Sequence, residues 1–336
     1  ADCLFRRRRL LPPHDRFPSS ISPVPIAFFG APEFSVLPLV ALAESELVDV
    51  KMIVTQPDRK SGRGQRVIFN PVKATALDLG ITNIAQPHQI DDSFITELAK
   101  AGIDRGIVVA AGHICPRKLC DYFGYKLINI HASLLPRHRG ASPISEAILT
   151  GDSATGVTLM ELQFELDAGA ILAQSSVDIQ PEDTTGSLSD KLSDLGTQLL
   201  KENLAKWLNG DLVATQQHEP NATYAPKVQA TDAEIDWNHD GSVIERMVRA
   251  YSPWPTAYTF FNQKRLRLHR SNKIDNENVD SHYPGLVYRT RTGSIAVATG
   301  GSPVQLLDVQ LEGKKMMAAE DFANGMQHFI GSVLGT

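Results

Sequence analysis

The segment Val24-Pro25-Ile26-Ala27-Phe28-Phe29-Gly30 decides the fold class, because it has the pattern of a strand buried on both faces. Its central residues are apolar without alternation, and Gly30 ends the run. Similar apolar runs follow, several of them separated by helix-like stretches, at residues 48–55, 103–111, 126–131, 155–162 and 171–179. Strands that alternate with helices at this spacing indicate βαβ units. We therefore predict an α/β fold with a Rossmann-like, mostly parallel sheet and helices on both faces.

The pattern changes in the second half of the chain. A long helix is predicted at residues 185–208, because leucines recur there at helical spacing and Asn209-Gly210 ends the run. The polar segment 211–226 is predicted to be a linker, which makes residues 24–210 the first domain. Short runs that alternate with turns then predict a second domain at residues 227–334, a small OB-like β-barrel.

Composition excludes several classes of protein. A formal net charge of −5 argues against binding nucleic acid through bulk positive charge, although a local basic face is compatible with it. The odd, sparse set of three cysteines fits a reducing compartment, and Cys115 and Cys120 lack the short spacing of a zinc site. No apolar run approaches the ~18 residues of a membrane span, so we expect neither a metal nor a membrane partner.

Residues 1–23 precede the first predicted domain and differ from it in composition. They combine the basic run Arg6 to Arg9 with several Pro and Ser residues, which is typical of a disordered extension or of an organellar targeting segment. We expect a cytoplasmic protein, or a mitochondrial or plastid one if this segment is a transit peptide. The first strand is followed by Gly30-Ala31-Pro32 and not by G-x-G-x-x-G, so a dinucleotide enzyme is not expected.

The most informative segment for chemistry is Asn129-Ile130-His131-Ala132-Ser133-Leu134-Leu135-Pro136-Arg137-His138-Arg139-Gly140. Asn129 and His131 stand two positions apart at the end of a predicted parallel strand, so their side chains share one face. Ligands of open α/β sheets bind outside the carboxyl ends of the strands. An amide and an imidazole there can orient a carbonyl group and stabilise a developing oxyanion. The alternative is that the two side chains only close the end of the strand.

Asp167 is the second candidate, in Leu166-Asp167-Ala168-Gly169-Ala170 between the last two predicted strands of the first domain. An Asp before Ala-Gly is often a turn residue and nothing more. A loop that returns to the same edge of the sheet would instead bring this carboxylate against the imidazole of His131.

Two groups of cations are candidates for contact with phosphates. The segment 56–66 alternates glycines with basic residues, which predicts either a solvated surface loop or a flexible basic finger that meets phosphates. In the second domain, Arg265 and Arg267 alternate with apolar residues, so they are predicted to share one face of a strand. That strand face is either merely exposed or a second contact surface.

These residues resemble the formyltetrahydrofolate-dependent transferase family. The segment from Asn129 to Pro136 with Arg139-Gly140 is similar to the family signature, and Asp167 stands in a loop similar to its L-D-x-G loop. The resemblance implies catalysis by Asn129, His131 and Asp167, with 10-formyltetrahydrofolate as the formyl donor and no metal. The residues that it implies for folate binding are Ser133, Leu134, Leu135, Pro136, Ala111, Gly112, Leu166 and Gly169.

Other stretches resemble the members of the family that act on methionyl initiator tRNA. They are the opening motif at residues 29–34, the basic segment at 56–64, and the motifs at 223–227, 235–237 and 253–255. The resemblance implies transfer of the formyl group to the α-amino group of methionyl initiator tRNA, with a second domain that binds the tRNA. We expect a monomer. The tRNA contacts predicted from the basic segment 56–66 are Arg59, Lys60, Arg63 and Arg66, and the strand face with Arg265 and Arg267 adds a second predicted contact.

Two departures from the family pattern keep alternatives open. The aromatic residue that usually precedes the glycine of an A-x-G segment is missing in Val108-Val109-Ala110-Ala111-Gly112. The loop around Asp167 is close to the version in members that formylate amino-sugars. The alternatives are therefore a formyltransferase that acts on a nucleotide amino-sugar, and a catalytically weak homologue that binds tRNA.

Overall fold

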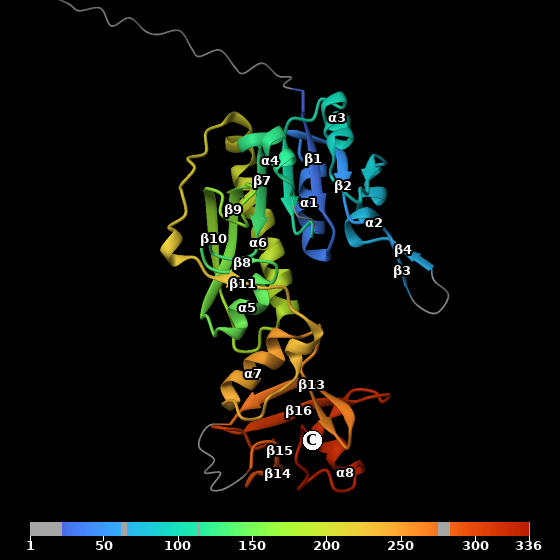
Figure 1. The fold of residues 1–336 in the computed structure, drawn as a ribbon, viewed down its shortest axis with the longest axis vertical. Helices are drawn as coiled ribbons and strands as arrows, with labels where there is room; N and C mark the ends of the chain where they lie inside the picture. Colours follow the sequence, from blue (N-terminus) through green and yellow to red (C-terminus); the bar gives the residue numbers. More distant parts are fainter. Residues whose placement is uncertain (1–21, 62–65, 113–114, 275–282, 336) are drawn as a thin grey trace, which may run out of the picture.

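The computed structural model describes residues 22–61, 66–112, 115–274 and 283–335 of the 336-residue chain. An α/β domain and a smaller, β-rich C-terminal domain follow one another along the long axis of the molecule (Figure 1). The predicted fold class is therefore confirmed. No helix among the described residues is both long and apolar enough to cross a membrane.

The α/β domain is built on one seven-stranded sheet with the order β10-β9-β7-β6-β1-β2-β5. All neighbours pair in parallel except β9, which is antiparallel to both β7 and β10. The strands are β1 (Val24–Gly30), β2 (Val48–Val54), β5 (Ile84–Ala85), β6 (Gly106–Val109), β7 (Leu127–His131), β9 (Ala154–Glu161) and β10 (Ile171–Asp178). The central strands are buried throughout, as their unbroken apolar runs predict.

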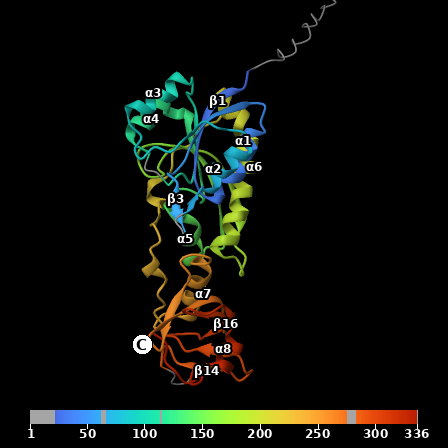
Figure 2. The same cartoon turned by 90° about the vertical axis from the view of Figure 1, so that its right-hand side faces the viewer.

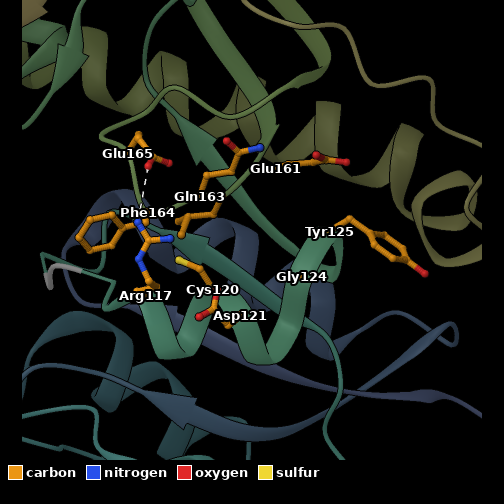
Figure 3. A pocket seen from close by; sticks show the side chains of 10 residues that line it. Arg117, Cys120, Asp121, Gly124, Tyr125, Glu161, Gln163, Phe164 and Glu165 are labelled. Atoms are coloured by element: carbon orange, nitrogen blue, oxygen red, sulfur yellow. Dashed lines mark ion pairs between the residues drawn. The ribbon is translucent and has the colours of Figure 1, made fainter.

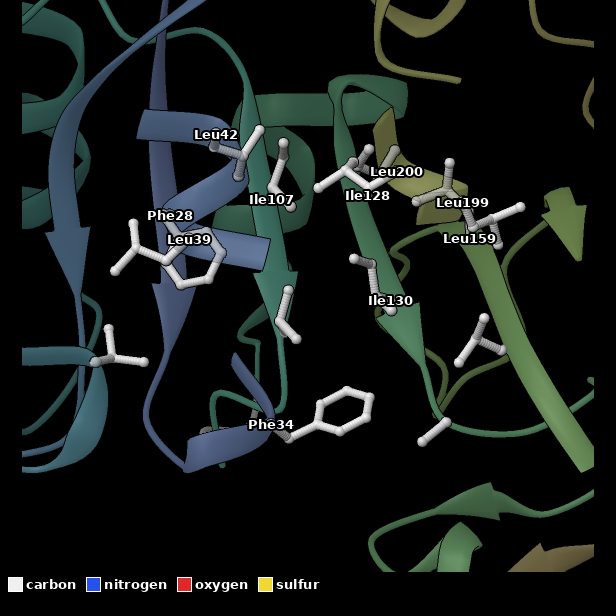
Figure 4. Packing of buried hydrophobic residues seen from close by; sticks show 14 of the residues in the cluster. Phe28, Phe34, Leu39, Leu42, Ile107, Ile128, Ile130, Leu159, Leu199 and Leu200 are labelled. Atoms are coloured by element: carbon white, nitrogen blue, oxygen red, sulfur yellow. The ribbon is translucent and has the colours of Figure 1, made fainter. Parts of the chain in front are cut away.

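Helices cover both faces of this sheet, as Figure 2 shows. One face carries α1 and α6, and Figure 4 shows Phe28, Ile107 and Ile130 of the strands packed there against leucines of these helices. The other face is covered by α3 and α4, whose Leu98 and Leu119 pack in a cluster with Phe29. The helices are α1 (Val36–Ala43), α2 (Pro71–Asp78), α3 (Asp92–Lys100), α4 (Arg117–Phe123), α5 (Pro143–Leu149) and α6 (Thr185–Asn209).

The C-terminal domain is an antiparallel half-barrel with the strand order β12-β13-β16-β15-β14. Helices α7 and α8 contribute Ile244 and Phe322 to its separate hydrophobic core. The elements are α7 (Gly241–Ala250), β12 (Tyr258–Phe261), β13 (Lys264–Lys273), β14 (Val287–Arg289), β15 (Ile295–Val297), β16 (Val304–Leu311), β17 (Met317–Ala318) and α8 (Ala319–Gly325). Strand β17 pairs with β16 beside the main path of the sheet.

The segment between the two domains packs along the first domain. Its strand β11 (Tyr224–Ala225) pairs in parallel with β8 (Arg139–Gly140), and Thr215 forms a bridge with Ile171. Beyond this segment, the two domains meet where Arg246 of α7 donates a hydrogen bond from Nε to the carbonyl oxygen of Leu149 in α5, at 3.1 Å. Residues 211–226, whose polar composition predicts a linker, are therefore paired with the first domain at defined positions.

Short elements complete the described chain. A hairpin of β3 (Arg59–Ser61) and β4 (Arg66–Ile68) protrudes from the first domain beyond α2 (Figure 1), where the sequence indicates only a loop. The single-turn 3-10 helices are η1 (Glu33–Ser35), η2 (Gly124–Lys126), η3 (Glu219–Asn221) and η4 (Ala230–Ala233).

Candidate active site

Asn129 and His131 stand at the carboxyl end of β7, in the middle of the sheet. The side chains of Ile128 and Ile130 fill the core under α1 and α6, so period-two geometry turns Asn129 and His131 to the opposite face. Both are buried, with 7% and 6% of their surface exposed. The two polar side chains at the carboxyl end of this strand thus lie where open α/β sheets bind ligands.

The loop after β9 brings Asp167 back to this position. Its Oδ2 lies 3.7 Å from Nδ1 of His131 and accepts a hydrogen bond from the main-chain N–H of Gly140 at 2.8 Å. Asp167 has a positive φ of 47°, which is uncommon for a residue other than glycine. The approach of the carboxylate to the imidazole, one of the two alternatives from the sequence, is therefore observed.

The tautomer of His131 follows from its second contact. Its Nε2 lies 2.9 Å from the carbonyl oxygen of His138. A carbonyl oxygen only accepts, so we infer that Nε2 carries a proton in every state of the ring. The remaining nitrogen, Nδ1, then faces Asp167 and is free to accept or donate a proton at the reacting group.

His138 supports the site through its main chain, and residue type alone did not reveal this role. It is 3% exposed, has a φ of 57°, and its N–H donates to Oγ1 of Thr223 at 2.8 Å. Its Nε2 lies 2.8 Å from Asp152, which Arg137 also contacts at 2.6 Å. Burial alone would raise the pKa of Asp152, but hydrogen bonds from Arg137 and His138 outweigh it and lower the pKa. The carboxylate therefore stays charged and fixes His138.

Thr158 organises the loop that follows β7. Its hydroxyl donates to the carbonyl oxygen of Ser133 at 2.6 Å and accepts from the N–H of Leu135 at 3.1 Å. It also accepts from Nε2 of Gln174 at 2.9 Å. Ser133 donates in turn to the carbonyl oxygen of Arg137 at 2.6 Å. Among the predicted folate residues of this loop, Ser133 and Leu135 are buried within the framework, whereas Leu134 and Pro136 are partly exposed.

The remaining predicted folate residues lie on neighbouring segments. Strand β6 ends two residues before its apolar run does, because Ala110 and Gly112 take positive φ values of 46° and 66°. The resulting turn is held by Gln56, whose Nε2 donates to the carbonyl oxygen of Ala111 at 3.3 Å. A Cβ atom at Gly112 would lie 2.2 Å from that same nitrogen and would displace the Gln56 amide, and the φ of 66° also favours glycine there.

In the loop after β9, Leu166 is exposed and Gly169 is tightly enclosed. A Cβ atom at Gly169 would lie 1.8 Å from the carbonyl oxygen of Glu161, so this position also requires glycine. A cavity of about 310 Å³ lies between this loop and α4 (Figure 3). There the guanidinium of Arg117 stacks on Phe164, 4.6 Å from the ring centroid. None of Asn129, His131 and Asp167 lines this cavity, so it is a neighbour of the site and not its centre.

Cys115 is close enough to Asp167 to be influenced by its charge. Burial first, and then the neighbouring Cys120 and Asp167, raise the pKa of the Cys115 thiol to about 12. A thiol with that pKa remains protonated near neutral pH and is a poor nucleophile. Cys115 is therefore a poor candidate for a nucleophile, and the imidazole, the amide and the carboxylate remain the candidates for chemistry.

Comparisons with known proteins agree with this architecture. The formyl transferase family model matches residues 24–204, and the model of the formyl transferase C-terminal domain matches residues 227–327. A methionyl-tRNA formyltransferase of Coxiella burnetii is 42% identical over 300 residues, covering 89% of this chain and 94% of that relative. The chain belongs to the methionyl-tRNA formyltransferase family.

A second relative and a solved structure extend the comparison. The methionyl-tRNA formyltransferase of Bacillus licheniformis is 41% identical over 312 residues, covering 92% of this chain and 98% of that relative. An N-formyltransferase from Helicobacter canadensis, solved with folinic acid and dTDP-3-aminofucose, superposes with a TM-score of 0.63 at 18% identity. It covers 84% of this chain and 98% of its own. At that identity the likeness concerns the fold alone.

In this member of the methionyl-tRNA formyltransferase family, the residues predicted to contact tRNA lie in two places. Arg59, Lys60 and Arg66 belong to the β3–β4 hairpin, whereas Arg63 falls outside the described residues. On β13, Arg265 and Arg267 are exposed while Leu266 and Leu268 are buried, so the predicted alternation is confirmed.

The exposed face of β13 also has a defined local structure. The guanidinium of Arg265 stacks on Tyr258 with 4.2 Å to the ring centroid. Arg265 and Arg267 line a hollow of about 230 Å³ together with Gln310 and Glu312. A stacked guanidinium keeps its outer N–H donors available for a phosphate.

Proposed function

We propose that the protein transfers the formyl group of 10-formyltetrahydrofolate to the α-amino group of methionyl initiator tRNA. The observation that carries the chemistry is the approach of Asp167 to Nδ1 of His131 at the carboxyl end of β7, beside Asn129. The identity of about two fifths to methionyl-tRNA formyltransferases over most of the chain supports the choice of acceptor. Bacterial relatives support a cytoplasmic place of action, and we keep the expectation of a monomer.

The neutral amine attacks the formyl carbon, which forms a new C–N bond and turns the carbonyl oxygen into an oxyanion. The side-chain amide of Asn129 donates a hydrogen bond to that oxygen. Because Nε2 of His131 is committed to the carbonyl of His138, Nδ1 is the atom that stabilises the oxyanion and moves protons. Collapse of the intermediate breaks the bond to N10 of the folate, which leaves with a proton donated by Nδ1 of the protonated His131.

Asp167 takes part in the other proton transfer, which removes a proton from the attacking amine and returns it to His131. Its 3.7 Å separation from Nδ1 of His131 is within the range of an ion pair but longer than a hydrogen bond. Contacts of this kind often tighten only when substrate binds. We propose that the carboxylate stabilises the protonated imidazole and accepts the proton that the attacking amine loses, directly or through a water molecule.

The donor is proposed to bind over the ends of β6 and β7. The turn at Ala111 and Gly112, the exposed Leu166, the backbone at Gly169 and the loop from Ser133 to Pro136 would line its pocket. Ser133 and Leu135 would contact the donor through their main-chain atoms, because both side chains are buried and the Ser133 hydroxyl is hydrogen-bonded within the loop.

A formylation assay tests the function directly. Methionyl initiator tRNA and a nucleotide amino-sugar are offered separately with 10-formyltetrahydrofolate, and formylated product is measured in a single turnover. We expect formyl-methionyl-tRNA from the first and no product from the second. Formylation of the amino-sugar alone would support the alternative acceptor. Binding of tRNA without binding of a folate analogue would support the catalytically weak homologue.

The C-terminal domain is proposed to contact tRNA phosphates through β13. Changing Arg265 and Arg267 to glutamate should weaken tRNA binding and reduce the slope of log K against log[salt] by about one for each arginine that no longer meets a phosphate. Affinity measured over a salt series checks this. The control is Lys201→Glu, an equal charge reversal on an exposed position of α6. An unchanged salt slope in both arginine variants would remove this surface from the tRNA interface.

A further inference from the structure

Arg139 is a buried cation whose partners come from the segment between the domains. Only 2% of its surface is exposed. Its Nη1 and Nη2 each donate to one carboxylate oxygen of Glu219 at 2.9 Å, and its Nε and Nη2 donate to Oε1 of Gln217 at 3.1 and 2.9 Å. The hydrogen bonds to Glu219 raise the pKa of Arg139. Gln217 and Glu219 of the interdomain segment therefore supply the hydrogen-bond partners of a cation that is buried beside the proposed catalytic site.

Gln217 connects this cation to the loop that carries Asp167. While its oxygen accepts from Arg139, its Nε2 donates to the carbonyl oxygens of Asp167 and Gly169 at 2.8 and 2.7 Å. Both hydrogens and both lone pairs of the amide are thus used. The two carbonyls flank Ala168, so one side chain clamps the turn on both sides of that residue.

The hydrogen bonds from Gln217 hold a main-chain conformation at Asp167 that is unfavourable for a residue other than glycine. Asp167 has a φ of 47°, a conformation that persists in a non-glycine residue when surrounding contacts hold it. A second contact is made by the N–H of Gly140, which donates to the carboxylate of Asp167. Gly140 itself belongs to β8, which pairs with β11 of the same interdomain segment. This segment therefore holds the Asp167 loop directly through Gln217 and indirectly through β8, which carries Gly140.

We propose that Gln217 is a positioning residue for the reaction, which keeps the carboxylate of Asp167 beside Nδ1 of His131. It touches no reacting atom and acts through Asp167, and the proposal rests on the proposed function for its kinetic readout. The catalytic centre is then incomplete without the segment that joins the two domains.

The variant Gln217→Glu tests this with little risk to the fold. A carboxylate still accepts from Arg139, but it has no N–H to donate to the carbonyls of Asp167 and Gly169. We expect kcat to fall by about 10- to 100-fold, as small misplacements of catalytic groups do, with KM for methionyl-tRNA nearly unchanged. The matched control is Gln216→Glu, the same change at an exposed neighbour, which should keep the activity of the wild type.

A double-mutant cycle separates positioning from an independent effect. In the Asp167→Asn background, Gln217→Glu should cost little further activity, because the group that it positions has already lost its function. Losses that multiply, or equal losses for Gln216→Glu and Gln217→Glu, would overturn the proposal.

Hydrogen exchange at the N–H of Gly140 gives a readout that does not depend on activity. This amide donates to Asp167, whereas its neighbours Arg139 and Ala141 donate to Thr223 and Ala225. In protein labelled with ¹⁵N-glycine, Gln217→Glu should accelerate exchange at Gly140, and wild-type exchange in the variant would overturn the clamp. If the wild-type protein did not formylate methionyl-tRNA, the proposed function would fail while this measurement still decided the positioning.

Discussion

Replacing His131 with alanine is expected to lower kcat for formyl transfer by about 10²–10⁴-fold, the usual contribution of a positioned acid–base group. The ring is 6% exposed, and its Nε2 is held by the carbonyl of His138, so Nδ1 is presented to the reacting group in one orientation. No other imidazole in the described residues contacts Asp167 in an ion pair. Single-turnover formylation of methionyl-tRNA at saturating donor measures the loss.

Two comparisons make this result specific. His88→Ala applies the same change to an exposed histidine and should leave kcat near the wild-type value. Titration of His131→Ala with a folate analogue and with tRNA should show retained binding, since the imidazole is assigned to the transition state and not to ground-state affinity. Near-normal turnover of His131→Ala would remove the imidazole from the mechanism.

The sheet was predictable because local sequence decides most of it. The buried strands of the first domain are continuous apolar runs, and the predicted run at residues 126–131 matches β7 (Leu127–His131) to within one residue. Strand β6 is shorter than its run, since the left-handed turn at Ala110 is imposed by contacts from Ser35 and Gln56, which come from elsewhere in the chain. The β3–β4 hairpin was missed because its glycine-rich, basic sequence has no strand periodicity.

The candidate site was predictable only in part. Asn129 and His131 follow from strand periodicity, because two positions on one strand share a face without any tertiary information. The approach of Asp167 depends on the path of a loop, and the sequence left it open. His138 contributes a carbonyl oxygen, which every residue type has, so its identity carries no signal. Gln217 stands in a polar segment whose composition predicts a linker, and only the fold brings it to Asp167.

Asparagine in place of Asp167 is expected to lower kcat by about 10²–10³-fold while leaving the loop in place. The two side chains have the same shape, and the amide oxygen of asparagine can still accept from the N–H of Gly140. The clamp from Gln217 binds main-chain carbonyls and is unaffected by the change. The variant therefore removes the charge and the proton acceptor but keeps the geometry.

Because Asp167→Asn removes the charge but keeps the loop geometry, hydrogen exchange and formylation should respond differently to it. Exchange at the N–H of Gly140 should stay near the wild-type rate in Asp167→Asn, whereas formylation slows at every pH, because an amide accepts no proton from the amine and does not stabilise a protonated His131. Asp178→Asn, the same change at an exposed strand end, is the control. Recovery of full activity at higher pH would assign the proton to another base, and the 3.7 Å approach of Asp167 to His131 would then be structural alone.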